Sequence, residues 1–429
     1  MESQGRISFP EYWRLIRYNP NFRRLWIAQM ISETGDWMYM IAIYDQLLKL
    51  TGGAAKSIGF AFVLQVLPQM LVSPMVGVLN DRLSRRSLMI IADIARMVVV
   101  GLMLLAASLE LVWLIYVLLF FETVFWALFE PGRSAVIPNI TEGKDTLAAN
   151  SLSSMTWSFN FAAGSAIGGF IAAVVGNQAV YILNSVSFLV SALFIRSMKF
   201  NEPHMEHLPP MRFRDLLDFS PVAEGVRYVS RDKRLLATMF VKCGLGFMAA
   251  NWVLVTILGD RKFPVVLPGL NPATAGIVGM SMLMGARGLG ALIGPVVGTH
   301  VAGANQVRMR TGIALGFFLS AIGYILLGYA PTMVLACLCL ILAHAGGSMI
   351  WVFSATMLQI NTEDKFRGRV FSSEFAFMTI SMSISSSLAG MFIDRGVSPD
   401  TVATSAGFIM LLPATLWLFA QRLWKVRQA

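Results

Sequence analysis

The sequence predicts an all-α membrane protein with twelve transmembrane helices, arranged as two pseudo-symmetric six-helix bundles. The first observation is composition: 56% of the 429 residues are hydrophobic and only 14% are charged. Soluble domains have about 45–50% apolar and about 25% charged residues. The second is twelve separate apolar segments, each of the roughly 20 residues that a helix needs to cross a bilayer. The third is an internal repeat at a shift of about 221 residues.

The apolar segments place one span after another along the chain. They are centred near Met38, Leu67, Val98, Leu118, Ala162, Ser187, Ala249, Gly285, Leu319, Leu342, Ser381 and Leu411. The first 25 residues are polar and basic, and no small-residue cleavage site follows a short apolar core. We therefore expect the first span to remain in the mature protein.

Basic residues are distributed unevenly between the two sides of the predicted membrane. The amino terminus, the carboxyl terminus and the loops on their side hold 26 of the 34 Lys and Arg residues, and the opposite loops hold 5. This is the bias of the positive-inside rule. It predicts a multi-pass protein of the cytoplasmic (inner) membrane with both termini in the cytoplasm. The net charge of +10 then reflects orientation and contact with anionic lipid, and we expect no nucleic-acid partner.

The repeat predicts where the two bundles divide. Residues 73–77 match residues 294–298, and Gly169 matches Gly390, at one shift. The longest polar stretch lies between the sixth and seventh spans. We therefore expect bundles at 1–197 and 237–429 and a cytoplasmic central loop at 198–236. An amphipathic segment from Phe213 to Tyr228 suits a helix on the membrane surface.

A charged connector follows the second span. It reads Gly77-Val-Leu-Asn-Asp81-Arg82-Leu-Ser-Arg85-Arg86 and must lie at a membrane surface, because unpaired charge in hydrocarbon is costly. The pattern resembles the loop between helices 2 and 3 of major facilitator superfamily transporters. The resemblance implies a conformational latch, in which Asp81 docks at the start of the eleventh span and Arg85 pairs with Glu130. We call Gly77, Asp81, Arg82, Arg85, Arg86 and Glu130 the latch residues.

Other ionisable residues lie within the spans, where each needs a partner, a cavity or a function. Asp93 and Arg96 share a face of the third span, Arg133 follows Glu130 in the fourth, and Arg287 lies in the eighth. These are interpreted as intramembrane charge pairs, because buried ions are normally paired.

Three acids form a separate group of candidates, namely Glu33, Asp36 and Glu122. They lie deep, and we expect no basic residue at the same depth on adjacent spans. A carboxyl group in apolar surroundings tends to hold a proton, because desolvation disfavours its charged form. These acids are candidates for proton coupling or for recognising a cationic substrate. The alternative is a protonated acid that hydrogen-bonds between helices.

The fifth span carries small residues that resemble an antiporter motif. Gly164, Gly168 and Gly169 correspond to the glycines of G-P-x-x-G-G, with Ser165 in place of proline. The alternative is that they only allow two helices to pack closely. Aromatic candidates for lining a substrate cavity are Trp37, Trp126, Trp157, Trp252 and Trp351; the alternative is that they face lipid or neighbouring helices.

Three polar segments narrow the resemblance to a branch of the superfamily. Residues 21–26, 130–138 and 365–370 are similar to the drug:proton antiporters that include macrolide, multidrug and siderophore exporters. The resemblance implies proton-coupled export of amphipathic organic compounds by alternating access, driven by the proton gradient. A siderophore or lysophospholipid transporter is one alternative, and a ligand-sensing receptor on a carrier fold is another.

The sequence contains no motif for catalysis. There is no G-x-x-x-x-G-K-[ST] loop for ATP, and the histidines lack metal-site spacing. The three cysteines all fall within predicted spans and are interpreted as small buried residues. We expect a monomer that is not an enzyme and holds no metal or cofactor.

Overall fold

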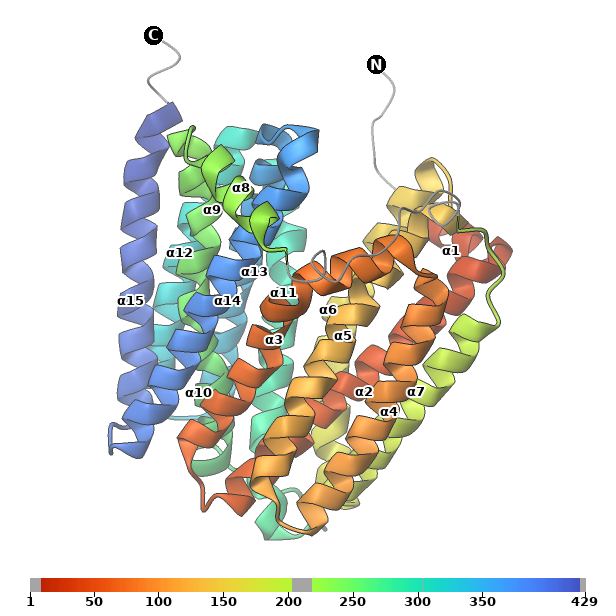
Figure 1. The fold of residues 1–429 in the computed structure, drawn as a ribbon. Coiled ribbons are helices and arrows are strands. Elements are labelled where there is room, and N and C mark those ends of the chain that lie inside the picture. Colours follow the sequence, from red (N-terminus) through yellow and green to blue (C-terminus); the bar gives the residue numbers. More distant parts are fainter. Residues whose placement is uncertain (1–8, 203–217, 304, 425–429) are drawn as a thin grey trace. The chain divides into compact units, whose positions relative to one another are not determined.

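The computed structural model describes residues 9–202, 218–303 and 305–424. Throughout these ranges the regular secondary structure is helical (Figure 1), which confirms the predicted all-α class. The α-helices are α1 (Phe9–Tyr18), α2 (Pro20–Leu50), α3 (Ala55–Arg82), α4 (Arg85–Ser108), α5 (Val112–Ile140), α6 (Lys144–Val174), α7 (Asn177–Arg196), α8 (Ser220–Val229), α9 (Lys233–Gly246), α10 (Ala250–Arg261), α11 (Ala275–Ala302), α12 (Gln306–Gly328), α13 (Met333–Asn361), α14 (Asp364–Asp394) and α15 (Pro399–Ala420).

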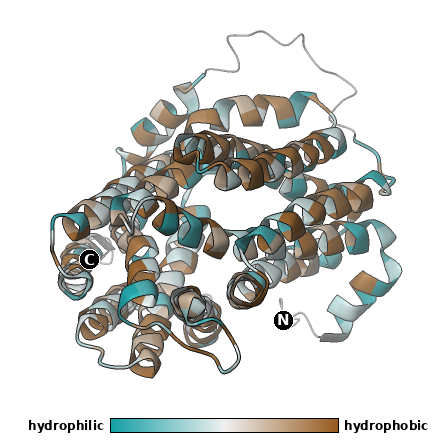
Figure 2. Cartoon of the chain, turned by 90° about the horizontal axis from the view of Figure 1, so that it is seen from below, coloured by the Kyte–Doolittle hydropathy of each residue, from teal (hydrophilic) through white to brown (hydrophobic). Residues whose placement is uncertain are grey.

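Eleven helical segments of the described chain are long and apolar enough to cross a membrane. They are α3 to α7, the continuous segment Lys233–Arg261 that contains α9 and α10, and α11 to α15. Figure 2 shows hydrophobic residues along most of these helices and hydrophilic residues concentrated at the connecting turns. The 31-residue helix α2 is not among the eleven, because Gln29, Glu33 and Asp36 lower the hydropathy of its middle. The count of twelve spans therefore stays a prediction.

The chain forms two compact units. The first contains the described residues up to Ala42, together with Leu71–Ile171 and those from Val175 to Asp218. The second contains Ile43–Met70, Ala172–Val174 and the described residues from Phe219 onward. In the first unit α4 packs against α5 and α7, and in the second α13 packs against both α11 and α12. The second unit thus includes the adjoining ends of α2 and α3, although these helices belong to the first sequence repeat.

The predicted charged connector is mostly helical. Residues 77–82 belong to α3 and α4 begins at Arg85, so only Leu83 and Ser84 lie between the helices. Ser84 caps α4 by accepting from the Ser87 backbone N–H at 3.2 Å. A second cap comes from Glu202, whose Oε1 accepts from the Arg85 backbone N–H at 2.7 Å. These acceptors satisfy amide groups that a helix start leaves open.

The seventh predicted span is interrupted by a 3₁₀ turn at Phe247–Ala249, between α9 and α10. Two serines of α14 form hydrogen bonds with backbone carbonyl groups at or just before this turn. Ser381 donates to the Cys243 carbonyl and Ser385 to the Phe247 carbonyl, each at 2.7 Å. Polar partners of this kind allow irregular backbone at membrane depth. Of the predicted amphipathic segment from Phe213 to Tyr228, residues 213–217 lie outside the described ranges, and α8 covers most of the remainder.

Glycines of the antiporter-like motif bring α6 against α2. A Cβ atom on Gly168 would lie 2.4 Å from Met38 Cα, and one on Gly164 would lie 2.8 Å from Trp37 Cβ. Gly169 is also buried. The absence of side chains at Gly164 and Gly168 therefore permits close contact between the two helices.

Prediction for Gly168. The variant Gly168→Ala should destabilise the protein by about 1–3 kcal/mol, because the new methyl group meets rigid backbone and forces the helices apart. Gly101→Ala is the matched control, since its Cβ would meet only Ser185 Oγ, at 3.9 Å. Thermal unfolding in detergent should show a lower midpoint for Gly168→Ala alone; equal midpoints would contradict the close contact.

Candidate functional site

A buried arginine of α4 holds two acids from two other helices. Arg96 Nη2 lies 2.7 Å from both Oδ1 and Oδ2 of Asp36 on α2. The same guanidinium contacts Glu122 Oε1 on α5, at 2.8 Å from Nη2 and 3.0 Å from Nε. Arg96 is 1% exposed, and its guanidinium lies over the Phe188 ring at 4.1 Å. We call Asp36, Arg96 and Glu122 the Arg96 cluster.

A second polar network starts one helical turn earlier on α2. Glu33 accepts hydrogen bonds from Gln29 Nε2 at 2.9 Å and from Asn160 Nδ2 at 3.2 Å. Gln29 Oε1 in turn accepts from Arg133 Nη1 at 3.1 Å, and Arg133 forms an ion pair with Glu130. We call these five residues the Arg133 chain. Because Glu33 and Asp36 lie at i and i+3, one face of α2 joins both networks.

One expectation about the deep acids is wrong. Asp36 and Glu122 do have a basic partner, because Arg96 reaches both of them. Comparing the depths of residues on separate spans did not reveal these contacts. The long, flexible side chain of Arg96 places its charge away from its own backbone position. The spacing of Asp93 and Arg96 also suggested a pair with each other, but Arg96 makes its hydrogen bonds to Asp36 and Glu122 instead.

Asp93 is a third acid beside the Arg96 cluster. Its side chain is 0% exposed, and in the described part of the chain neither carboxylate oxygen has a hydrogen-bond partner. Ser191 of α7 and Arg96 are its polar neighbours. Three carboxyl groups therefore surround one guanidinium group, and a full negative charge on all three would be costly in this buried site.

The latch residues lie at the adjoining ends of α3 and α4, with Glu130 on α5. Arg85 Nε donates to the Asn80 carbonyl and Nη1 to the Ala135 carbonyl, each at 3.1 Å. Glu130 pairs with Arg133 instead of Arg85 in this structure. Asp81 is exposed and Arg82 is half-buried, while Arg86 donates to the Arg196 carbonyl. The latch, which requires an exchange of partners, stays a prediction.

The aromatic candidates fall into different environments. Trp37 lies edge-on to Trp157 at 5.5 Å, next to Asp36 in sequence. In the second unit, Trp252 is 6% exposed and lies under the Arg287 guanidinium, at 3.7 Å from the ring centroid. Trp351 is 44% exposed, and Trp126 is half-buried.

An additional buried ion pair lies in the second unit. Lys242 Nζ of α9 is 2.8 Å from Glu374 Oε2 of α14, and their side chains are 6% and 2% exposed. The Lys242 ammonium also lies 4.4 Å from the Trp351 ring centroid. Sequence reasoning did not select this pair, although opposite charges inside two apolar spans were the signal that was available.

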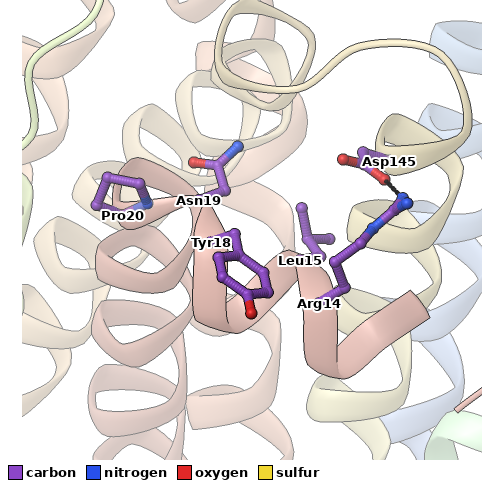
Figure 3. A pocket seen from close by; sticks show the side chains of 6 residues that line it. All are labelled: Arg14, Leu15, Tyr18, Asn19, Pro20 and Asp145. Carbon is purple, nitrogen blue, oxygen red and sulfur yellow. Dashed lines mark hydrogen bonds and ion pairs between the residues drawn. The ribbon is translucent and has the colours of Figure 1, made fainter. Parts of the chain in front are cut away.

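A surface hollow is lined by residues outside both the Arg96 cluster and the Arg133 chain. It is lined by Arg14, Leu15, Tyr18, Asn19, Pro20 and Asp145 and has a volume of about 410 Å³. Figure 3 shows Arg14 and Asp145 pointing toward each other across it, where they form an ion pair at 2.6 Å. The hollow joins the amino-terminal helix to α6 and contains none of the intramembrane carboxyl groups.

Solved structures of transporters share this fold. The nucleoside transporter NupG aligns with a TM-score of 0.72 and 11% identity, over 93% of this chain and 98% of that chain. A POT family transporter in complex with 5-aminolevulinic acid aligns with a TM-score of 0.73 and 12% identity, over 94% and 96%. This chain therefore has the fold of these two structures.

The sequence defines the family within that class. A profile described as "Transmembrane secretion effector" matches residues 16–428, and the chain belongs to this family of the major facilitator superfamily. Three bacterial proteins are similar to this chain in sequence. The uncharacterised MFS-type transporter YfiS of Bacillus subtilis is 22% identical over 64% of this chain and 63% of YfiS. The putative bacilysin exporter BacE of Bacillus subtilis is 26% identical over 93% of each chain. Macrolide efflux protein A of Streptococcus pyogenes is 24% identical over 89% of this chain and 90% of that protein.

Prediction for Arg96. The variant Arg96→Met should destabilise the protein by about 3–5 kcal/mol, because it leaves two buried carboxylates without their cation. Adding Asp36→Asn and Glu122→Gln should recover much of that loss, since the acids then carry no charge. Thermal unfolding of the single and triple variants in detergent measures both effects, and a triple variant less stable than Arg96→Met would contradict the pairing.

Proposed function

We propose that this protein exports amphipathic organic compounds across the cytoplasmic membrane in exchange for protons, by alternating access. The observation that carries the proposal is the pair of acids on one face of α2. Glu33 belongs to the Arg133 chain, and Asp36 belongs to the Arg96 cluster. The exporters among its relatives support the direction of transport.

The Arg96 cluster supplies a physical basis for coupling. When Asp36 is ionised, its attraction to Arg96 holds α2 against α4, and Arg96 also binds Glu122 of α5. A proton on Asp36 would cancel its negative charge and weaken that attraction. Protonation would thereby change how strongly three helices are held together, which a coupled transporter requires.

Glu33 supplies a second proton site in the proposal. Its hydrogen bonds come from the neutral amides of Gln29 and Asn160, and Arg133 acts on it through Gln29. A cationic group of a substrate would compete with protons for either acid. Nearby rings of Trp37, Trp157 and Phe161 offer apolar contacts suited to an amphipathic compound.

The remaining expectations belong to the same proposal. Both termini would lie in the cytoplasm, as the 26-to-5 distribution of basic residues predicts. The protein would act as a monomer in contact with membrane lipid and draw on the proton gradient without a cofactor. The latch residues would exchange partners between the two access states.

Prediction for the three acids. Neutralising Glu33→Gln, Asp36→Asn and Glu122→Gln together should reduce substrate-induced proton flux in proteoliposomes to the level of protein-free liposomes. The flux would be screened with cationic drugs, macrolides, siderophores and lysolipids. Asp145→Asn is the control, since this acid is partly exposed and paired with Arg14. Wild-type flux in the triple variant would refute the coupling assignment.

Prediction for Asp81. The variant Asp81→Asn should severely reduce transport while leaving membrane insertion and the thermal unfolding midpoint unchanged, because Asp81 is exposed in this structure. Glu202→Ala provides the contrast: it removes the carboxylate that caps α4 and should lower the unfolding midpoint by an amount equivalent to about 1 kcal/mol. Normal transport by Asp81→Asn would exclude the latch role.

A further inference from the structure

A carboxylate at the end of one helix caps the start of another in the second unit. Asp394 is the last residue of α14. Its Oδ1 accepts from the Ala55 backbone N–H at 2.7 Å, and its Oδ2 accepts from that of Lys56 at 3.1 Å. These are the first two residues of α3. A negative charge is unfavourable at the carboxyl end of its own helix and favourable at the amino end of another, so Asp394 stabilises α3 at the expense of α14.

Glycines allow the same two helices to touch by their backbones. A Cβ atom on Gly59 of α3 would lie 2.8 Å from the Ser386 carbonyl oxygen of α14. A Cβ atom on Gly390 of α14 would lie 2.8 Å from the Ala55 carbonyl oxygen. Each helix thus contributes a glycine to one contact, and any side chain at either position would push the helices apart.

Further contacts hold the connector between α2 and α3. Arg261, the last residue of α10, donates to the Gly53 carbonyl. The Phe62 ring of α3 stacks on Trp252 of α10 at 5.1 Å. Ala55 and Ile58 are fully buried. The connector and the start of α3 come from the first sequence repeat, whereas α10 and α14 come from the second.

We propose that Asp394 is the capping residue of a gate, which is closed in this structure and opens when the two repeats separate at this end. The inference rests on the proposed transport cycle, because alternating access requires contacts between the repeats to break. The positive-inside count places the connector at residues 51–54 outside the cell, so the gate faces the extracellular side. When it opens, water replaces the Asp394 carboxylate at the first amides of α3.

The chemistry of the contact suits a reversible closure. Asp394 is exposed, so water is available to both the carboxylate and the amides when they part. Loss of one helix-capping acceptor changes the ratio of closed to open molecules by about fivefold. A contact of this strength biases a conformational equilibrium without locking it.

The test measures access to a thiol beneath the glycine contact. Ser386 is fully buried, and its Oγ has no hydrogen-bond partner in the described ranges, so Ser386→Cys is a nearly isosteric reporter. The three native cysteines are first replaced by alanine. A membrane-impermeant maleimide is then added to intact cells that express the full chain, and the labelling rate is measured.

The variants separate gating from general loosening. We expect Asp394→Ala to raise the labelling rate about fivefold, and Asp394→Asn to raise it less because one acceptor oxygen remains. Gly390→Val should also raise it by wedging the helices apart. In the control Asp400→Asn, which breaks only the Lys262–Asp400 pair of the same unit, the rate should stay at the wild-type level.

Two outcomes would overturn the gate. One is a wild-type labelling rate in Asp394→Ala, whatever the rate in Gly390→Val, and the other is an equal increase in Asp400→Asn. The measurement needs no substrate, so it is independent of the proposed export function. Faster labelling together with an absence of proton flux for every compound tested would support the gate and refute the proposed function.

Discussion

The guanidinium group of Arg96 is the interaction on which the first unit depends. It is almost completely buried and bonds to acids from α2 and α5. A buried charge without partners is costly, so three helices must keep their relative positions to satisfy it. The Arg133 chain adds a second set of polar contacts that also includes α2. The helix with the least apolar middle is therefore the one that the polar networks hold in place.

Glycine contacts supply the complementary constraint. Hydrophobic side chains do not by themselves favour one helix arrangement in lipid, because the surrounding lipid tails are equally apolar. Specific packing arises where backbones approach closely, as Gly168 does against Met38 and Gly390 against Ala55. The polar networks and the glycine contacts together define helix positions that apolar composition alone leaves open.

Sequence reasoning predicted the class of fold well and the site in part. The apolar segments predicted by position the eleven helical segments that are long and apolar enough to cross a membrane, because burial in lipid requires long apolar runs. Sequence reasoning also selected Asp36 and Glu122 as candidates for proton coupling, and Arg96 as a member of an intramembrane charge pair. The pairing was missed because the three residues lie on different helices, and only their packing brings the charges together. Lys242 and Glu374 were missed for the same reason.

The sequence by itself determined that this is a helical membrane protein of the major facilitator superfamily, and it identified the acids that carry the proposed coupling. These properties depend on composition, spacing and local motif, which are one-dimensional. The tertiary structure decided which charge meets which: Arg96 with Asp36 and Glu122, and Asp394 with the start of α3. These contacts join residues far apart in the chain, and they depend on helix packing and side-chain reach, which residue spacing along one helix does not encode.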